Sequence, residues 1–230
     1  LRLVGSEMCI RDRPQNLEDV IALISLYRPG PMDSIPTYLR NRHEPDKISY
    51  KTPQLAHILD VTNGCIVYQE QVMQIFRELA GFSFGQADNV RRAMSKKKHA
   101  VMEAEREHFV HGCTEPGHEC PGCVANGISE KVANEIYDEM SSFASYAFNK
   151  SHAACYAYVA FQTAYLKCHY PSEFMAALLT SVLDNTDKVI EYSGECARLG
   201  IKVLPPDVNI SNGGFTADNG KIRFGLNAVK

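Results

Sequence analysis

Four polar residues, Asn149-Lys150-Ser151-His152, stand directly before a stretch without charge that is almost entirely apolar, Ala153 to Phe161. The stretch predicts a buried helix, whose first turn would then carry Lys150 and His152. The N-terminus of a helix bears partial positive charge and unpaired N–H groups, so cations are disfavoured there unless an anion is also present. The arrangement therefore indicates an anionic ligand. In the alternative interpretation Ser151 only caps the helix, Lys150 is solvated and His152 is a hydrogen-bonded core histidine.

A second group places five cations within eight positions: Arg91, Arg92, Lys96, Lys97 and Lys98. The whole chain has a net charge of −3, so this basic cluster stands against an acidic background. Arginine binds phosphate oxygens through paired hydrogen bonds and lysine acts as a mobile point charge, which suits a clamp on phosphates. In the alternative interpretation these cations complement the C-terminal end of a helix and are otherwise solvated.

A third group of residues could bind metal. Cys113, His118, Cys120 and Cys123 lie within eleven positions and are compatible with a tetrahedral zinc site. Structural zinc loops usually draw their second pair of ligands from farther along the chain, however. Free thiols on a surface loop are therefore the alternative to zinc.

The remaining composition is that of an ordinary globular protein, with 45% hydrophobic and 22% charged residues. No apolar run approaches the roughly 18 residues of a membrane span, and no export signal is recognisable. Four isolated cysteines in apolar or helical contexts are expected to be reduced core thiols of a cytoplasmic protein: Cys65, Cys155, Cys168 and Cys196.

The elements that must position these groups are mainly helical. Capping residues and apolar periodicity predict helices from Asn16 to a stop at Tyr27 and over 68–80, 83–94, 101–109, 129–140, 171–183 and 185–199. By periodicity alone, residues 68–71 belong to the surface of their helix. Near the C-terminal end, residues 201–204 have strand-like composition, and residues 215–226 predict a hairpin with its turn at Asp218-Asn219-Gly220. The predicted fold class is mainly α with a small β-hairpin element.

The domain organisation follows from these elements. The first thirteen residues have neither a signal-peptide core nor helical periodicity, and Leu3 to Asp12 resembles the translation of a sequencing adaptor. We therefore predict an adaptor-derived or non-native segment over 1–13 and a helical domain over 14–200. Residues 201–230 are expected to begin a small β element that leads to a next domain outside this chain.

Four motifs follow one another along the chain in the order YRPGP, YQEQVM, RRAMSKKK and FNKSHAA. Together they resemble the fingers region of bacterial DNA polymerase III alpha subunits, the C-family replicative polymerases. The resemblance covers essentially all of residues 14–230 and departs from the family at Ser95, where a glycine is usual. It implies a helical fingers domain, with a nucleotide- and DNA-binding role for residues of all four motifs: Arg28, Tyr68, Gln69, Arg91, Arg92, Lys96, Lys97, Lys98, Asn149, Lys150, Ser151 and His152.

The same resemblance assigns the catalytic step to residues outside this chain. In this family, palm aspartates hold Mg²⁺ for nucleotidyl transfer, and they precede the fingers. The present chain has no D-x-D pair in a strand-like setting, so we expect it to be inactive by itself. The implied partners are template-primer DNA, dNTPs and other replicase subunits, including the sliding clamp through other regions. The alternative function is a non-catalytic helical nucleic-acid-binding module that uses the same basic cluster.

Overall fold

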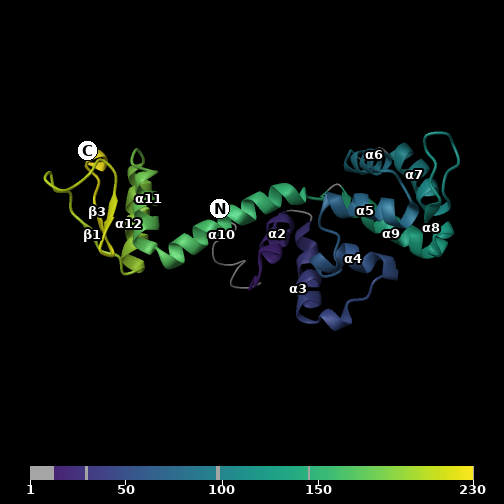
Figure 1. Cartoon of the computed structure of the whole chain (residues 1–230), viewed down its shortest axis with the longest axis horizontal. Coiled ribbons are helices and arrows are strands. Elements are labelled where there is room, and N and C mark those ends of the chain that lie inside the picture. Colours follow the sequence, from purple (N-terminus) through teal and green to yellow (C-terminus); the bar gives the residue numbers. More distant parts are fainter. Residues whose placement is uncertain (1–12, 29–30, 97–98, 145, 230) are drawn as a thin grey trace. The chain divides into compact units, whose positions relative to one another are not determined.

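The computed structural model describes residues 13–28, 31–96, 99–144 and 146–229 (Figure 1). Within these ranges the chain is mainly helical, with a small three-stranded sheet near the C-terminal end, which confirms the predicted fold class. The chain divides into two compact units, residues 1–158 and 159–230. The predicted adaptor-derived segment lies almost wholly outside the described residues.

The first unit is helical. Between its longer helices lie the short 3-10 turns η1 (Pro31–Ser34), η2 (Pro45–Lys47), η3 (Pro53–Leu55) and η4 (Asp60–Thr62). Its helices are α2 (Leu17–Leu26), α3 (Ile35–His43), α4 (Ala56–Leu59), α5 (Gln69–Ala80), α6 (Phe84–Ser95), α7 (His99–His111), α8 (Gly122–Ala125), α9 (Glu130–Ala144) and the first part of α10 (Lys150–His169).

Local capping chemistry fixes several of these helix ends as predicted. Asn16 Oδ1 accepts a hydrogen bond from the Asp19 N–H at 2.8 Å, and α2 begins between them. Ser83 and Gln86 form a reciprocal capping box at the start of α6. Gly81 ends α5 with a φ of 74°, a left-handed conformation that favours glycine.

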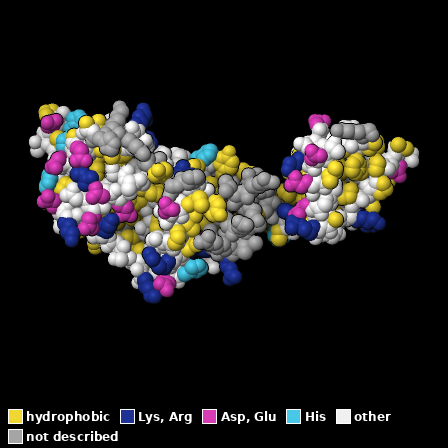
Figure 2. All heavy atoms as spheres, turned by 180° about the vertical axis from the view of Figure 1, so that it is seen from behind, with side chains coloured by type: hydrophobic (Ala, Val, Ile, Leu, Met, Phe, Trp, Pro, Cys, Tyr) yellow, Lys and Arg dark blue, Asp and Glu magenta, His cyan; other side chains and the backbone are white. Residues whose placement is uncertain are grey.

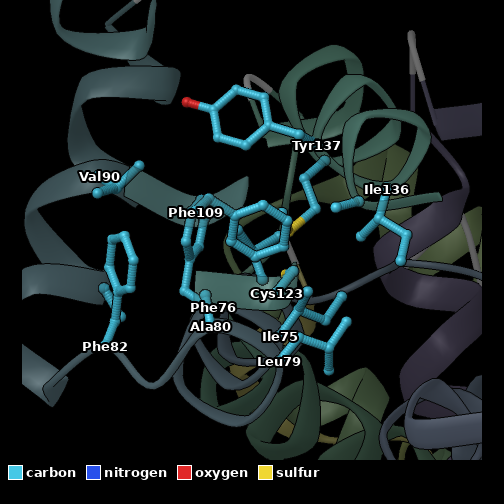
Figure 3. Packing of buried hydrophobic residues seen from close by; sticks show 14 of the residues in the cluster. Ile75, Phe76, Leu79, Ala80, Phe82, Val90, Phe109, Cys123, Ile136 and Tyr137 are labelled. Carbon is cyan, nitrogen blue, oxygen red and sulfur yellow. The ribbon is translucent and has the colours of Figure 1, made fainter. Parts of the chain in front are cut away.

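The main core of this unit lies between α5, α6, α7 and α9 (Figure 3). Phe76 is fully buried at its centre, with ring centroids 5.0 Å from Phe109 and 6.0 Å from Tyr137. Both pairs meet edge to face, an arrangement that aromatic quadrupoles favour. This core packs α5 and α6 against each other, and the candidate site lies at the start of α5 and along α6.

A smaller hydrophobic cluster joins α2 and α3 to the beginnings of α5 and α10. It includes Tyr68 and, from α10, the small residues Ala153 and Ala157. Tyr68 and Gln71 are buried, so the alternative interpretation from periodicity alone, in which residues 68–71 lie on the surface, does not hold for these two. The reason is tertiary: the segment before α5 pairs with Phe148 through a parallel bridge that helical periodicity does not reveal.

The second unit packs α11 (Pro171–Thr180) and α12 (Thr186–Arg198) against a small sheet. The strands β1 (Val203–Leu204), β2 (Thr216–Asp218) and β3 (Lys221–Arg223) lie in the order β1-β3-β2, and the turn η5 (Leu226–Ala228) follows them. β1 is parallel to β3, and β2 is antiparallel to it. The predicted hairpin is confirmed, since Asn219 and Gly220 connect β2 to β3 with φ values of 48° and 76°.

The structure divides the chain between Tyr158 and Val159, whereas the sequence predicted a change of domain at residue 201. One hydrophobic cluster contains Met175 and Leu179 of α11 together with Ile201, Phe215 and Ile222. Residues on both sides of the predicted boundary therefore share a core, and the boundary between compact units falls inside α10.

The prediction of a buried helix after residue 153 is wrong for this chain. Only small side chains of α10, those of Ala153, Ala157 and Ala160, are buried, whereas its large apolar side chains are exposed. Cys155 and Cys168 are exposed as well, so they are not the core thiols that their apolar neighbours suggested; Cys65 and Cys196 are buried. Among the described residues, no helix combines the length and apolar composition that a membrane span requires.

Candidate functional site

Gln69, the first residue of α5, connects three segments that are distant in sequence. Its side-chain Nε2 donates a hydrogen bond to the Ala147 carbonyl at 3.0 Å, and its Oε1 accepts one from Arg91 Nη1 at 3.1 Å. Its backbone N–H donates to the Phe148 carbonyl at 2.9 Å. The start of α5 therefore holds both α6 and the segment that leads into α10.

Glu70 accepts hydrogen bonds from the N-terminal end of α10. Its carboxylate accepts hydrogen bonds at 3.1 Å from Asn149 Nδ2 and from the Lys150 N–H. The Lys150 ammonium group is paired in turn with Glu18 Oε2 at 3.1 Å. Within the described chain, Glu70 and Glu18 thus supply negative charge at this helix end, where it complements the helix dipole. The anionic ligand expected from the sequence stays a prediction.

The cap of α10 is Asn149 and not Ser151. Asn149 Oδ1 accepts a hydrogen bond from the His152 N–H at 2.8 Å, while Ser151 lies exposed in the first turn. The His152 ring contacts two aromatic rings at a tilt, with centroids 5.5 Å from Phe148 and 4.8 Å from Tyr156. His152 is also exposed, so it is not a core histidine.

Two arginines of α6 share one carboxylate. Asp88 Oδ1 accepts hydrogen bonds from Arg91 Nη2 and Nε, and Asp88 Oδ2 is paired with Arg92 Nη2 at 2.8 Å. The hydrogen bonds from Arg91, with a further contribution from Arg92, hold the pKa of Asp88 below its ordinary value. Arg91 is mostly buried, whereas 64% of the Arg92 side chain is exposed. Arg92 can therefore reach solvent and ligands while Arg91 is fixed in place.

These residues line one groove of about 500 Å³. Gln69, Glu70, Asp88, Arg91 and Asn149 contribute to its wall, and so do exposed parts of α5 and Phe84. The groove therefore brings together polar groups from the YQEQVM, RRAMSKKK and FNKSHAA motifs.

Arg28 contacts the ring of Phe148. Its guanidinium carbon is 4.5 Å from the centre of the Phe148 ring, and its Nη2 donates to the Tyr146 carbonyl. Burial lowers the pKa of Arg28 from its ordinary value. The arginine of the YRPGP motif therefore supports the segment before α10, although it is not part of the groove wall described above.

Tyr68 contacts Lys150 through its ring, whose centre is 5.4 Å from the Lys150 Nζ. The Tyr68 hydroxyl is buried and has no hydrogen-bond partner among the described residues. Burial raises the pKa of Tyr68, so the phenol remains neutral. Its ring serves as a support under the lysine side chain.

The basic cluster is only partly described. Lys96 is exposed at the C-terminal end of α6, while Lys97 and Lys98 lie outside the described residues. Over the face that Figure 2 shows, Lys and Arg alternate with Asp and Glu. Among the described residues, the cations that line the groove are Arg77 and Arg91, while Arg92 and Lys150 are next in the chain to the wall residues Arg91 and Asn149.

The predicted zinc site does not form within the described part of the chain. Cys113 and Cys120 face each other across an isolated antiparallel bridge, but Cys123 packs inside the hydrophobic core (Figure 3). His118 is exposed, and no group of three or more potential ligands is found among the described residues. Burial raises the pKa of Cys123 to about 12, which disfavours the thiolate that zinc requires.

Sequence reasoning missed the three carboxylates that organise the site: Glu18, Glu70 and Asp88. Asp88 had a readable signal, because residues three and four positions apart meet on one face of a helix and Asp88 precedes Arg91 and Arg92 at that spacing. Glu70 had no such signal, since its partners lie 79 and 80 positions farther along the chain.

Two family models match parts of this chain. A family model described as the bacterial DNA polymerase III alpha subunit finger domain matches residues 4–117, and a helix-hairpin-helix motif model matches residues 200–230. The first match begins inside the predicted adaptor-derived segment, whose origin remains a prediction. The residues of the second match form β1 to β3 and η5 in the described structure. The class is thus a polymerase finger domain.

The chain is also similar to individual proteins over most of its length. The chain is 50% identical to DNA polymerase III subunit alpha of Thermus aquaticus over 223 residues, which are 95% of this chain and 18% of the relative. It is 46% identical to the same subunit of Bacillus subtilis (strain 168) over 96% of this chain and 19% of the relative. The chain therefore belongs to the bacterial DNA polymerase III alpha subunit family and spans about a fifth of its relatives' length.

Proposed function

We propose that this chain is part of the fingers of a DNA-templated DNA polymerase, and that its groove receives the phosphates of an incoming dNTP or of the template-primer. The observation that carries the proposal is the convergence on Gln69. This residue contacts both Arg91 and the segment before Lys150, so two cationic motifs 59 positions apart border one groove.

The chemistry of the groove supports phosphate binding. Arg77 and Arg91 line it. Arg92 and Lys150, each next in the chain to a wall residue, have exposed side-chain surface and are held by single carboxylates, Asp88 and Glu18. A polyphosphate carries more charge than one carboxylate and can replace it as the partner of these cations. Arg91 remains anchored by Asp88 and Gln69 and would supply a fixed direction for the incoming anion.

The remaining parts of the reaction lie outside this chain. Mg²⁺ would be held by palm carboxylates of the parent subunit, and it would supply neutralisation of the phosphate charge. We extend the proposal to a cytoplasmic replicase that binds template-primer DNA and dNTPs, and that meets its sliding clamp through other regions of the subunit.

The test is Lys150→Ala in a full-length subunit that contains residues 14–230. Loss of one donor to developing negative charge costs about 3 kcal/mol, or roughly 10²-fold in rate. We expect nucleotide incorporation to fall by that order while primer-template affinity changes little. Lys131→Ala on the exposed surface of α9 is the matched control. Unchanged incorporation would exclude Lys150 from the site, and an equal loss of DNA affinity would favour the non-catalytic binding module.

A further inference from the structure

The longest helix of the chain exposes large apolar side chains instead of burying them. Residues 153–166 of α10 contain no charged residue. Nevertheless 56% of Phe161, 48% of Tyr165 and 45% of Leu166 are exposed. A solvated helix face is normally polar, and folded proteins rarely leave large apolar patches in water without a partner.

The exposed residues form one continuous stripe. Phe161, Gln162, Tyr165 and Leu166 of the second unit, hereafter the α10 stripe, follow the i, i+1, i+4, i+5 spacing of a single helix face. All four line a shallow hollow of about 440 Å³. The rings of Phe161 and Tyr165 lie 6.4 Å apart. The stripe therefore has both the composition and the relief of a packing surface.

We propose that the α10 stripe is an internal packing surface of the parent subunit, covered by an apolar protein surface from outside these 230 residues. About four fifths of the relatives' length lies outside the part that this chain matches. The composition of these residues predicts a core helix. A surface supplied by the remaining polypeptide would bury them in the complete subunit. This inference depends on family membership and not on the phosphate-binding proposal.

The charge pattern favours protein over nucleic acid as the occupant. Binding of a nucleic-acid strand combines aromatic stacking with cations that follow the phosphates. Over the fourteen positions from Ala153 to Leu166 there is no lysine, arginine or histidine. The stripe thus offers stacking surfaces without any charge for a backbone, and an apolar protein surface fits it better.

Two exposed cysteines provide built-in probes. Cys168 lies three positions after Tyr165, next to the stripe on the helix surface, and Cys155 lies seven positions before Gln162 in the same helix. Cys123 and Cys196 are buried and serve as internal controls. The experiment compares maleimide labelling of the native 230-residue chain with that of a full-length subunit containing residues 14–230, and measures each cysteine by peptide mass spectrometry.

We expect Cys155 and Cys168 to react rapidly in the 230-residue chain and at least about tenfold more slowly in the full-length subunit, because a covered thiol reacts only after local opening. Equal rates in the two proteins would overturn the proposal. So would protection in the isolated chain, whether it persists on dilution, as for a cover within the chain, or disappears, as for a second copy. Protection of the full-length subunit only after addition of primer-template would identify nucleic acid as the occupant and also overturn it.

A pair of variants gives an independent readout. Phe161→Glu with Tyr165→Glu should leave the unfolding midpoint of the 230-residue chain nearly unchanged and lower that of the full-length subunit. Ile190→Glu, at an α12 side chain that is 66% exposed and off the stripe, is the matched control and should change neither. A full-length subunit that tolerates the double variant as well as the control would contradict the proposal.

Discussion

The Asp88 carboxylate accepts two hydrogen bonds from the Arg91 guanidinium, at 2.6 Å and 3.0 Å, one turn farther along α6. A third hydrogen bond, to Gln69, fixes the opposite side of the same guanidinium. Asp88 therefore sets the direction of an arginine that lines the groove, while its second oxygen holds Arg92.

Asp88→Asn removes the charge that orients both arginines while keeping the size of the side chain. In a full-length subunit we expect the KM for dNTP to rise by about tenfold with a smaller change in kcat, because charge-assisted hydrogen bonds contribute about 1.5 to 3 kcal/mol and this pair is partly solvated. Steady-state incorporation kinetics provide the measurement, and Asp88→Glu should restore part of the loss. A lower KM would show instead that Asp88 mainly repels the nucleotide.

Gln71→Leu should destabilise the first unit strongly. The buried Gln71 side chain accepts hydrogen bonds from the Val67 and Tyr68 N–H groups and donates to the Ile58 carbonyl and Thr62 hydroxyl. Leucine would leave these buried groups without partners, at a cost above about 3 kcal/mol. Thermal unfolding followed by circular dichroism measures the effect.

Gln74→Leu is the control for this prediction, because Gln74 bonds only to Glu78 at the surface of the same helix. We expect a change within about 0.5 kcal/mol for it. Similar midpoints for the two variants would contradict the role given to Gln71.

Stability should fall at alkaline pH through two buried thiols. Burial raises the pKa of Cys65 to about 11 and that of Cys123 to about 12, whereas an unfolded thiol ionises near pH 8.5. The unfolded state therefore binds fewer protons above pH 8.5, and the free energy of unfolding decreases from there toward the folded pKa values. At pH 10 each thiol accounts for a loss of about 2 kcal/mol relative to pH 8.

Unfolding midpoints between pH 7 and pH 10 test this effect in the wild-type chain, Cys65→Ala and Cys123→Ala. Each variant should show a shallower decline with pH, whatever its stability at pH 7. Identical slopes in all three proteins would mean that other groups cause the alkaline loss.

Metal analysis of the purified chain should find well below about one equivalent of zinc, and a chelator should leave the unfolding midpoint unchanged, because a structural zinc contributes folding energy directly. The reason is the position of Cys123 in the core, away from solvent and His118. Cys113→Ser is the matched variant and should show the same indifference to the chelator. One bound zinc whose removal lowers the midpoint would reverse this conclusion.

The helix ends and the hairpin could be predicted from sequence because their determinants are local. Asn16 caps α2 through a residue three positions away, and Asn219-Gly220 adopts the conformations that its hairpin requires. The binding role of Arg91, Arg92 and Lys150 stays a prediction, and the structure adds the carboxylates that hold these cations.

The remaining features depend on partners that are distant in sequence. Periodicity alone predicts Gln71 on the surface, and only its contacts to the Ile58 carbonyl and the Thr62 hydroxyl show that it is buried. Cys123 reads as a metal ligand until the core around Phe76 is known. The apolar stretch of α10 was predicted to be buried on composition alone, and composition does not say which polypeptide supplies the cover.

The contacts of Gln69 and Glu70 also bear on the order of folding. Their hydrogen bonds to Ala147, Asn149 and Lys150 close loops of 78 to 80 residues, whereas much of the core around Phe76 comes from consecutive helices, α5 with α6 and α6 with α7. Closing a long loop costs entropy before any contact compensates for it, so near contacts form first. We therefore expect the groove to be completed late in folding, once α5 to α9 already form a packed unit.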